Sequence, residues 1–449
     1  MILLYVDNFR GFSETYIPFT DVNFLMGENS TGKSSILSLL NLLDNAGFWL
    51  GQKFNYEDIH LGSFNEIADS DMDKNFFKIG VFDLNSGSTK GDVPYKSIIM
   101  KFENDKGLPY ISEFSYITND HSVVVNIGKK SIKYQTREIS NVPEDRSEAL
   151  MFFKNWIQEM NVNIKSKGYN IVKIPSSARI PLPIIWSIIE AELKTKKKQI
   201  VNSSNKAKGI PQLGPEIVIP SFIGNFCWVA PIRAKPKRTY DNYGVSPSSE
   251  GDHAPYLLNT FLNFSKPSYK KDVLSSIESF GLQSGLFESI NTVPFGKDET
   301  SPFELNIILN SKKFKISNVG YGVSQALPII VEIISRTKNT LFAIQQPEVH
   351  LHPRAQAALG EFIYNMHLAE NKTFVIETHS EYLINRFRIK ISQNEAKKVN
   401  SQVLFFERTD NGNKVHIIEI DDKGRYSEDQ PEAFMNFFVK EELDLLEIF

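Results

Sequence analysis

The sequence predicts an α/β protein with a mixed central sheet, an antiparallel β lobe and a helical insertion. Three observations support this fold class. A glycine-rich loop lies between a short apolar strand and an apolar helix, alternating strand-like segments follow, and two strongly helical segments interrupt them. We therefore expect an N-terminal lobe over residues 1–142, a helical insertion over 143–214 and a C-terminal lobe over 215–449.

The glycine-rich loop lies in "MGENSTGKSSIL", which runs from Met26 to Leu37 and fits the pattern G-x-x-x-x-G-K-[ST]. Its glycines let backbone N–H groups turn toward phosphate oxygens, Lys33 supplies a positive charge, and the Ser34 hydroxyl can ligate Mg²⁺. The strand "VNFLM" precedes the loop and the helix "SSILSLLNLLD" follows it, so a phosphate would sit at a helix N-terminus. A chance glycine-rich turn would not require these flanks. The expected phosphate-binding residues are Gly27, Glu28, Asn29, Ser30, Thr31, Gly32, Lys33, Ser34 and Ser35.

Composition limits the class of protein. The 449 residues carry a formal charge of −3, so overall charge does not indicate a nucleic-acid-binding protein. The single cysteine, Cys227, excludes a disulfide framework or a cysteine metal cluster, and its apolar surroundings predict a buried side chain. No apolar run approaches the roughly 18 residues of a membrane span, and no signal peptide is apparent, so we expect a soluble cytoplasmic protein.

The other elements follow from hydrophobic periodicity and turn residues. Strands are expected at 1–9, 15–19, 76–84, 97–104, 110–117 and 122–135, and the last four read as an antiparallel meander. Helices are expected at 144–160 and 181–201, followed by a loop or linker at 202–216, strands at 217–222 and 226–234, and a hairpin at 304–320.

Four features follow in a fixed order near the C-terminus. "VGYGVSQALPIIVEII" is a glycine-containing turn that opens an apolar helix, with Ser324 near the helix start. The strand "TLFAI" leads into "QQPEVHLHP", and the helix "PRAQAALGEFIYNM" begins at that proline. The strand in "KTFVIETHS" then carries His379 at its end.

This order of motifs resembles the ABC-class ATPase head, in the branch of RecF, SMC and OLD (overcoming-lysogenization-defect) proteins rather than the transporter branch. The strings "GYGVSQ", "QPEVHLHPRAQA" and "ETHSEYLINR", with "NFRGF" and "PIRAKPKRTY", are similar to a family of stand-alone bacterial ATPases. Many of those relatives are encoded beside nuclease or toxin effectors in anti-phage defence systems. The resemblance covers both ends of the chain, and the middle has no such signature.

The resemblance implies roles for particular residues. The loop from Gly27 to Ser35 would be Walker A and bind ATP with Mg²⁺, and "FAIQQPE" would be Walker B. Ser324 would stand in the ABC signature and reach the γ-phosphate of ATP bound by a second subunit. His379 would be the switch histidine, the alternative being a structural histidine at a strand end. Gln52 is a candidate for the Q-loop glutamine.

The chain departs from this pattern at Walker B. The two positions that normally hold the Mg²⁺-binding acid and the acid that orients water are Gln345 and Gln346, whose neutral amides cannot act as bases. Three explanations are open: slow turnover that uses Glu348 or Glu377, ATP sensing without hydrolysis, or acids replaced deliberately to trap ATP. The expected catalytic residues are Gln345, Gln346, Glu348 and His379, and the expected metal site is Ser34 with Gln345.

The leading functional hypothesis is an ATP-gated homodimeric switch that controls a separate effector, a nuclease or toxin, in anti-phage defence. The alternatives are an ATP-binding scaffold with little hydrolysis, a RecF-like DNA-repair ATPase and, less in keeping with the motifs, a transporter ATPase. DNA or RNA binding stays open, although the usual explanation of the basic runs "KKSIKYQTR", "KTKKK" and "AKPKR" is a solvated face. No membrane contact is expected.

Overall fold

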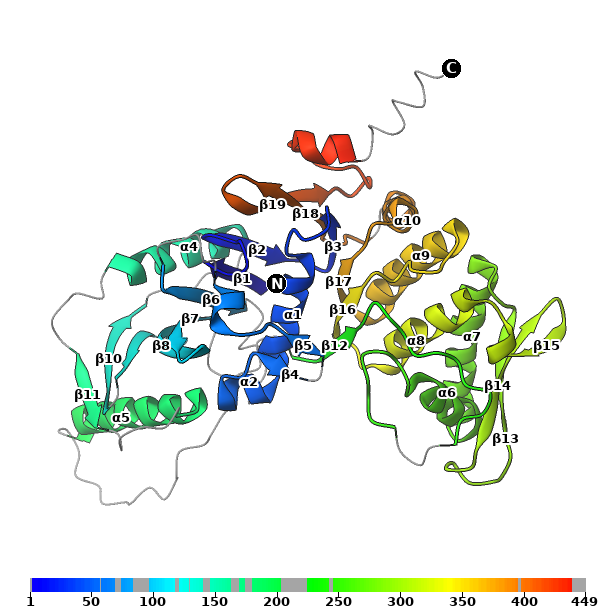
Figure 1. Cartoon of the computed structure of the whole chain (residues 1–449), viewed down its shortest axis with the longest axis horizontal. Coiled ribbons are helices and arrows are strands. Elements are labelled where there is room, and N and C mark those ends of the chain that lie inside the picture. The colour runs from blue at the N-terminus through cyan, green and yellow to red at the C-terminus, as the bar shows by residue number, and fades with distance from the viewer. Residues whose placement is uncertain are drawn as a thin grey trace. The chain divides into compact units, whose positions relative to one another are not determined.

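The computed structural model describes residues 2–56, 58–68, 74–83, 97–117, 121–128, 130–139, 146–162, 169–173, 180–202, 224–241, 245–394 and 397–437. These residues form two units (Figure 1). Unit 1 comprises Met1–Phe19, Ser38–Gly224 and Asp410–Asn413, and unit 2 comprises Thr20–Leu37, Asn225–Thr409 and Lys414–Phe449. The three-region division expected from the sequence stays a proposal.

Unit 2 is organised by a six-stranded sheet in the order β12-β16-β17-β3-β18-β19. From β12 to β18 every neighbouring pair is parallel. Their strands are short apolar runs, as expected for a sheet that is buried on both faces. The strands are β3 (Val22–Gly27), β12 (Phe226–Val229), β16 (Leu341–Gln345), β17 (Thr373–Glu377), β18 (Ser401–Thr409) and β19 (Gly412–Ile420).

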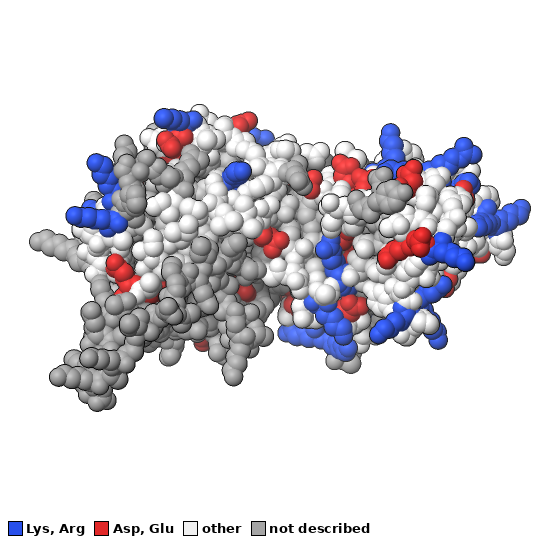
Figure 2. Space-filling view, turned by 90° about the horizontal axis from the view of Figure 1, so that it is seen from below, with Lys and Arg blue, Asp and Glu red and all other residues white. Residues whose placement is uncertain are grey.

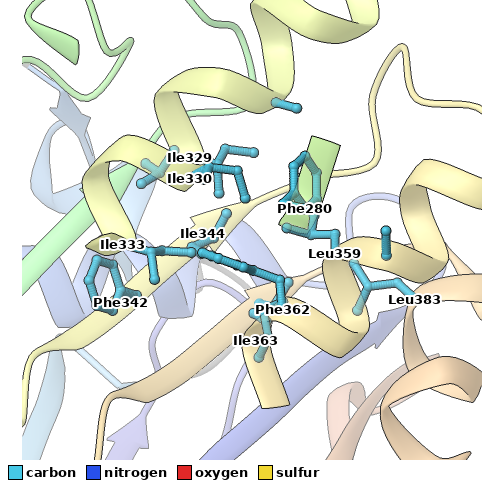
Figure 3. Packing of buried hydrophobic residues seen from close by; sticks show 14 of the residues in the cluster. Phe280, Ile329, Ile330, Ile333, Phe342, Ile344, Leu359, Phe362, Ile363 and Leu383 are labelled. Carbon is cyan, nitrogen blue, oxygen red and sulfur yellow. The ribbon is translucent and has the colours of Figure 1, made fainter. Parts of the chain in front are cut away.

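Helices cover this sheet and build its hydrophobic core. Figure 3 shows how side chains of α8, β16 and α9 gather in one cluster. Each such side chain contributes about 1.5–3 kcal/mol relative to leaving it exposed. The helices of unit 2 are α6 (Ala254–Asn263), α7 (Pro267–Ser284), α8 (Tyr321–Ser335), α9 (Pro353–Glu370) and α10 (Glu381–Ser392), and α1 (Lys33–Asp44) begins in it. A second sheet of this unit contains β13 (Ser289–Pro294), β14 (Phe303–Leu309) and β15 (Lys312–Lys315), all antiparallel.

Unit 1 contains an eight-stranded sheet in the order β11-β10-β9-β8-β7-β6-β1-β2, and every neighbouring pair is antiparallel. This confirms the antiparallel lobe expected from the sequence. The strands are β1 (Ile2–Asp7), β2 (Thr15–Phe19), β6 (Phe76–Asp83), β7 (Ser97–Asp105), β8 (Leu108–Ile117), β9 (His121–Ile127), β10 (Ser131–Glu138) and β11 (Asn170–Lys173). The small elements are α2 (Ala46–Gly51), β4 (Asn55–Tyr56), β5 (Ile59–His60) and α3 (Phe64–Ile67).

Two helices, α4 (Arg146–Val162) and α5 (Leu182–Asn202), cover opposite faces of the unit 1 sheet. Ile117 packs in a cluster with Phe153 of α4, whereas the neighbouring Tyr116 contacts Trp186 of α5 with ring centroids 4.8 Å apart. Successive residues of a strand point to opposite faces, so the two helices lie on different sides. The segment expected to be a helical insertion therefore contains both expected helices, and it also contributes the strand β11.

Several sequence-based expectations can be followed in the described residues. Cys227 is buried in β12, as predicted. The expected strand at 217–222, most of the 202–216 loop and the side chains of "KTKKK" lie outside the described residues. Among the helices that the structure describes, none is both long and apolar enough to cross a membrane.

Lys and Arg side chains gather over unit 2 in Figure 2, with Asp and Glu among them. This mixture of charges does not single out a nucleic-acid surface, so the question of DNA or RNA binding stays open. Five lysines of unit 2 are exposed on α7, directly before it or on β15. They are Lys266 before α7, Lys270 and Lys271 in α7, and Lys312 and Lys313 in β15.

Candidate functional site

The loop that follows β3 begins with a glycine that no other residue could replace without strain. Gly27 has φ +129°, and a Cβ built on it would lie 2.1 Å from the carbonyl oxygen of Phe406 on β18. Gly27 and Phe406 are paired in the parallel register of β3 and β18. The close approach of these strands therefore requires glycine.

Lys33 begins α1 and points back into the loop. Its Nζ donates to the carbonyl oxygens of Gly27 at 2.8 Å and Glu28 at 2.6 Å. Burial lowers the pKa of Lys33, against the opposing influence of the Glu377 and Glu28 charges. The ammonium is thus held over the loop, with backbone carbonyls as acceptors that a phosphate oxygen could replace.

The remaining loop residues form an open turn. Glu28, Asn29 and Ser30 are exposed, and the buried Thr31 donates from its hydroxyl to the Glu28 carbonyl at 2.8 Å. Ser30 and Gly32 both have positive φ, at +63° and +92°. Successive backbone N–H groups in a turn of this kind make a concave anion-binding surface. Ser35 lies in the first turn of α1.

Two carboxyl-terminal strand ends meet beside the loop. Gln345 of β16 and Glu377 of β17 are partners in the parallel register, and Glu377 is paired with Leu25 of β3 on its other side. Both oxygens of Glu377 accept from Ser34 Oγ, at 3.1 and 2.9 Å, and its Oε2 also accepts from Gln345 Nε2 at 3.1 Å. In parallel sheets this edge is where ligands bind.

The segment after β16 turns sharply and contacts the end of β17. Gln346 has φ +41°, and its N–H donates to the carbonyl of Glu377 at 2.8 Å. Glu348 Oε1 accepts from the backbone N–H of His379 at 2.7 Å. The residue His379 is exposed at the start of the loop that leads into α10. The four expected catalytic residues therefore lie at the ends of two adjacent strands.

A buried arginine supports this turn from the neighbouring strand. Arg233 follows β12 and donates from Nη2 to the carbonyls of Gln345 at 3.0 Å and Gln346 at 3.2 Å. Burial lowers its pKa to about 10, and the nearby charge of Glu348 opposes that shift. The sequence pattern alone assigns no role to Arg233. Its signal in the sequence was an arginine inside the apolar segment that was expected to be a strand at 226–234.

Ser324 lies in a separate pocket. Its hydroxyl donates to the carbonyl of Tyr321 at 2.8 Å in the first turn of α8. The pocket is lined by the loop that contains "AKPK" and by α8, and its described lining includes no residue of the 27–35 loop. Lys235 and Lys237 belong to that lining. Ser324 thus shares this pocket with Lys235, Lys237 and Asp252.

Gln52 belongs to unit 1 and is held by its own surroundings. It is buried at the end of α2, and its Oε1 accepts from the backbone N–H of Ile111 at 3.0 Å. Through this hydrogen bond Gln52 links the end of α2 to β8. The role of a Q-loop glutamine stays a prediction.

A family comparison decides the class of this site. The model of the AAA ATPase domain matches residues 1–218 and 251–384, which include the whole loop and the ends of β16 and β17. The chain belongs to the AAA ATPase domain family. Membership in the AAA ATPase domain family implies ATP binding. Arg233 lies in the part of the chain that this model leaves unmatched.

Comparison with curated proteins gave no match. Among solved structures, the chain is similar to an SMC head bound to the C-winged helix domain of ScpA, at 11% identity, with 93% of this chain and 97% of that chain covered and a TM-score of 0.43. The chain is also similar to the SMC head domain of Thermotoga maritima, at 11% identity, with 93% of this chain and 98% of that chain covered and a TM-score of 0.35. It is similar to an SMC head with a coiled coil and joint from Pyrococcus yayanosii at 10% identity, with 99% of this chain and 100% of that chain covered and a TM-score of 0.41. Because these TM-scores are all below 0.5, the family match and the geometry carry the argument for this AAA ATPase domain.

Proposed function

We propose that this chain is an ABC-class ATPase that acts as a nucleotide-gated homodimeric switch for a separate effector, a nuclease or toxin, in bacterial anti-phage defence. One observation carries the proposal: the loop with Lys33 and Ser34 stands directly beside the paired ends of β16 and β17. The resemblance of the motifs to stand-alone defence ATPases supports the effector and the defence role.

The loop supports binding of ATP with Mg²⁺. Lys33 would exchange its two carbonyl acceptors for the β- and γ-phosphates, and the N-terminus of α1 would favour the same negative charge. Ser34 Oγ and the Glu377 carboxylate are oxygen donors of the kind that Mg²⁺ prefers, so the residues present fit this ion. Mg²⁺ would neutralise charge on the phosphates during cleavage.

Hydrolysis would depend on the turn after β16. Gln346 would orient water by hydrogen bonding, and Glu348, in the same turn, could act as a general base there. Its Oε2 is buried and has no hydrogen-bond partner among the described residues. His379, whose backbone already contacts Glu348, would act as the switch histidine toward the γ-phosphate.

A second copy of the chain is the proposed source of Ser324. The described lining of the Ser324 pocket contains no residue of the 27–35 loop, which supports a contact between this serine and ATP bound by another subunit. A two-fold dimer would then contain two equal sites, and ATP would favour the closed state by binding it more tightly.

The deciding experiment measures assembly and turnover together. Light scattering of the purified chain with and without ATP and Mg²⁺ should show ATP-dependent dimers, and phosphate release should be slow but measurable. Intact ATP binding without phosphate release would favour the scaffold alternative, which the neutral Gln345 and Gln346 specifically support. Absence of any ATP-dependent change in mass would contradict the switch.

The effector requires a separate test. Affinity capture of the chain from its own source cells, with ATP and Mg²⁺ present, should retain a nuclease or toxin encoded next to its gene. A chain that retains no protein and instead shows ATP-stimulated DNA binding would favour the RecF-like alternative. The same capture with Lys33→Ala is the control for nucleotide dependence.

A further inference from the structure

Glu377, which the sequence left as one of two alternative acids for slow turnover, occupies a central position in the sheet. It ends β17, between the strand that ends in Gln345 and the strand that leads into the phosphate-binding loop. Glu377 is only 5% exposed. A carboxylate at this depth requires partners that compensate for lost hydration.

The partners of this carboxylate are neutral. They are the Ser34 hydroxyl and the Gln345 amide, at 2.9 to 3.1 Å. Lys33 is close enough for its pKa to be influenced by Glu377, but its Nζ donates to carbonyls of the loop. Among the described residues, Glu377 has no ion pair. Its negative charge is therefore available to a cation at Ser34.

We infer that Glu377 replaces the missing Walker B acid. Its carboxylate, one strand away from the usual position, supplies the negative charge that holds Mg²⁺ and its waters beside Ser34. Gln345 then acts as a positioning residue whose amide orients that carboxylate. This inference rests on the proposed ATP site and explains how a chain with Gln345 can keep a Mg²⁺-dependent nucleotide.

The other nearby acid, Glu348, is directed elsewhere. Its Oε1 accepts from the His379 backbone N–H, and its charge acts on Arg233. None of its hydrogen bonds in the structure reaches Ser34 or Gln345. The geometry therefore separates the two acids: Glu377 faces the serine of the phosphate-binding loop, and Glu348 faces the loop before α10.

The test measures Mg²⁺-dependent nucleotide affinity rather than turnover. Calorimetric titration with adenylyl imidodiphosphate, an ATP analogue, is carried out in EDTA and at a series of Mg²⁺ concentrations. It gives the Mg²⁺ concentration at which the affinity for the analogue has gained half of its total increase. Glu377→Gln should raise that concentration about 10–100-fold, as loss of a metal-supporting side chain typically does. Affinity in EDTA should not fall, because Lys33 and the loop remain.

Two further variants make the test specific. Glu348→Gln is the matched control and should keep the original Mg²⁺ dependence. The double variant with Gln345→Glu and Glu377→Gln should recover the original Mg²⁺ dependence, because positions 345 and 377 together again hold one carboxylate and one amide. Thermal unfolding followed by circular dichroism checks that each variant is folded.

The outcomes separate the inference from the proposed function. Unchanged Mg²⁺ dependence in Glu377→Gln, or its loss in Glu348→Gln alone, would overturn the role of Glu377 while ATP binding stands. If the unaltered chain binds the analogue neither in EDTA nor in Mg²⁺, the proposed ATP site itself is wrong and this inference falls with it.

Discussion

At the scale of single residues, Lys33 is the clearest link between sequence and chemistry. Its position follows from the spacing of the loop, and its two acceptors in the structure are the carbonyls of Gly27 and Glu28. Burial lowers its pKa, yet the charges of Glu377 and Glu28 favour the protonated form. A charged donor held in this loop is suited to the β- and γ-phosphates.

Lys33→Ala should abolish ATP binding. A charge-assisted hydrogen bond is worth about 1.5–3 kcal/mol, and the lysine would make more than one such bond to the phosphates. Isothermal titration with ATP and Mg²⁺ measures the loss. Lys338→Ala, at an exposed lysine between α8 and β16, is the control and should bind ATP normally. Normal affinity in a folded Lys33→Ala protein would contradict the site.

Gln345→Glu should lower the free energy of unfolding in EDTA by about 1–3 kcal/mol near neutral pH. The change removes the amide that donates to Glu377 and sets two carboxylates within about 3 Å of each other. Their repulsion raises the pKa of one carboxyl in the folded protein, so the variant should regain stability as the pH falls through that raised value. Urea unfolding at several pH values measures this effect.

Gln345→Met is the control for that experiment, because it removes the amide without adding a charge. Its loss of stability should diminish less at acidic pH than that of Gln345→Glu, because no second carboxylate is present. If both variants show the same pH dependence, Gln345 and Glu377 are not the close pair that the structure describes.

At the scale of elements, the packing of α9 against α10 helps to position the segment that connects the end of β17 to α10. Gly360 of α9 lies so close to α10 that a Cβ built on it would be 2.1 Å from the carbonyl oxygen of Leu383. Ser380 caps α10 by accepting from the Leu383 N–H at 3.1 Å, and His379 directly precedes that cap. The helix contact therefore helps to set the position of His379.

Gly360→Ala should destabilise unit 2 by about 1–3 kcal/mol, the usual cost of an added group in a packed interface, although alanine is the better helix former. Thermal or urea unfolding measures the change. Gly320→Ala is the matched control, because a Cβ at Gly320 meets no atom within 4 Å. Equal effects of the two substitutions would show that α9 and α10 have room to separate.

At the scale of the whole molecule, the phosphate-binding loop and the Ser324 pocket belong to the same unit but have different linings. A homodimer would bring the loop of one chain to the pocket of the other. The basic residues Lys235 and Lys237 would then add positive charge near the bound phosphates. ATP would serve as the contact between the two copies.

Ser324→Arg should prevent ATP-dependent dimers and leave ATP binding by the monomer nearly unchanged. The long charged side chain would obstruct the surface at Ser324 that is proposed to meet the second copy's nucleotide, and the loop around Lys33 would be untouched. Light scattering with and without ATP measures assembly. Ser317→Arg, at an exposed serine before α8, should still dimerise. Dimers of Ser324→Arg would require a different interface.

The sequence by itself determined the elements that depend on local pattern. The strand, glycine-rich loop and helix around Lys33, the antiparallel meander of unit 1 and the apolar strands before Gln345 and Glu377 all follow from periodicity and turn chemistry. The family match confirms the ATPase class. The strand β11 was missed, because a short, half-exposed strand inside a helical segment has little hydrophobic signal of its own.

Only the tertiary structure decided which distant side chains meet. Ser34 and Glu377 are 343 positions apart in the chain, and Arg233 reaches carbonyls 112 and 113 positions away. These contacts depend on the order and register of β12, β16, β17 and β3, which no local pattern encodes. The sequence marks a missing acid at Gln345, and the sheet places a buried carboxylate beside it, because parallel strands bring their carboxyl ends to one edge.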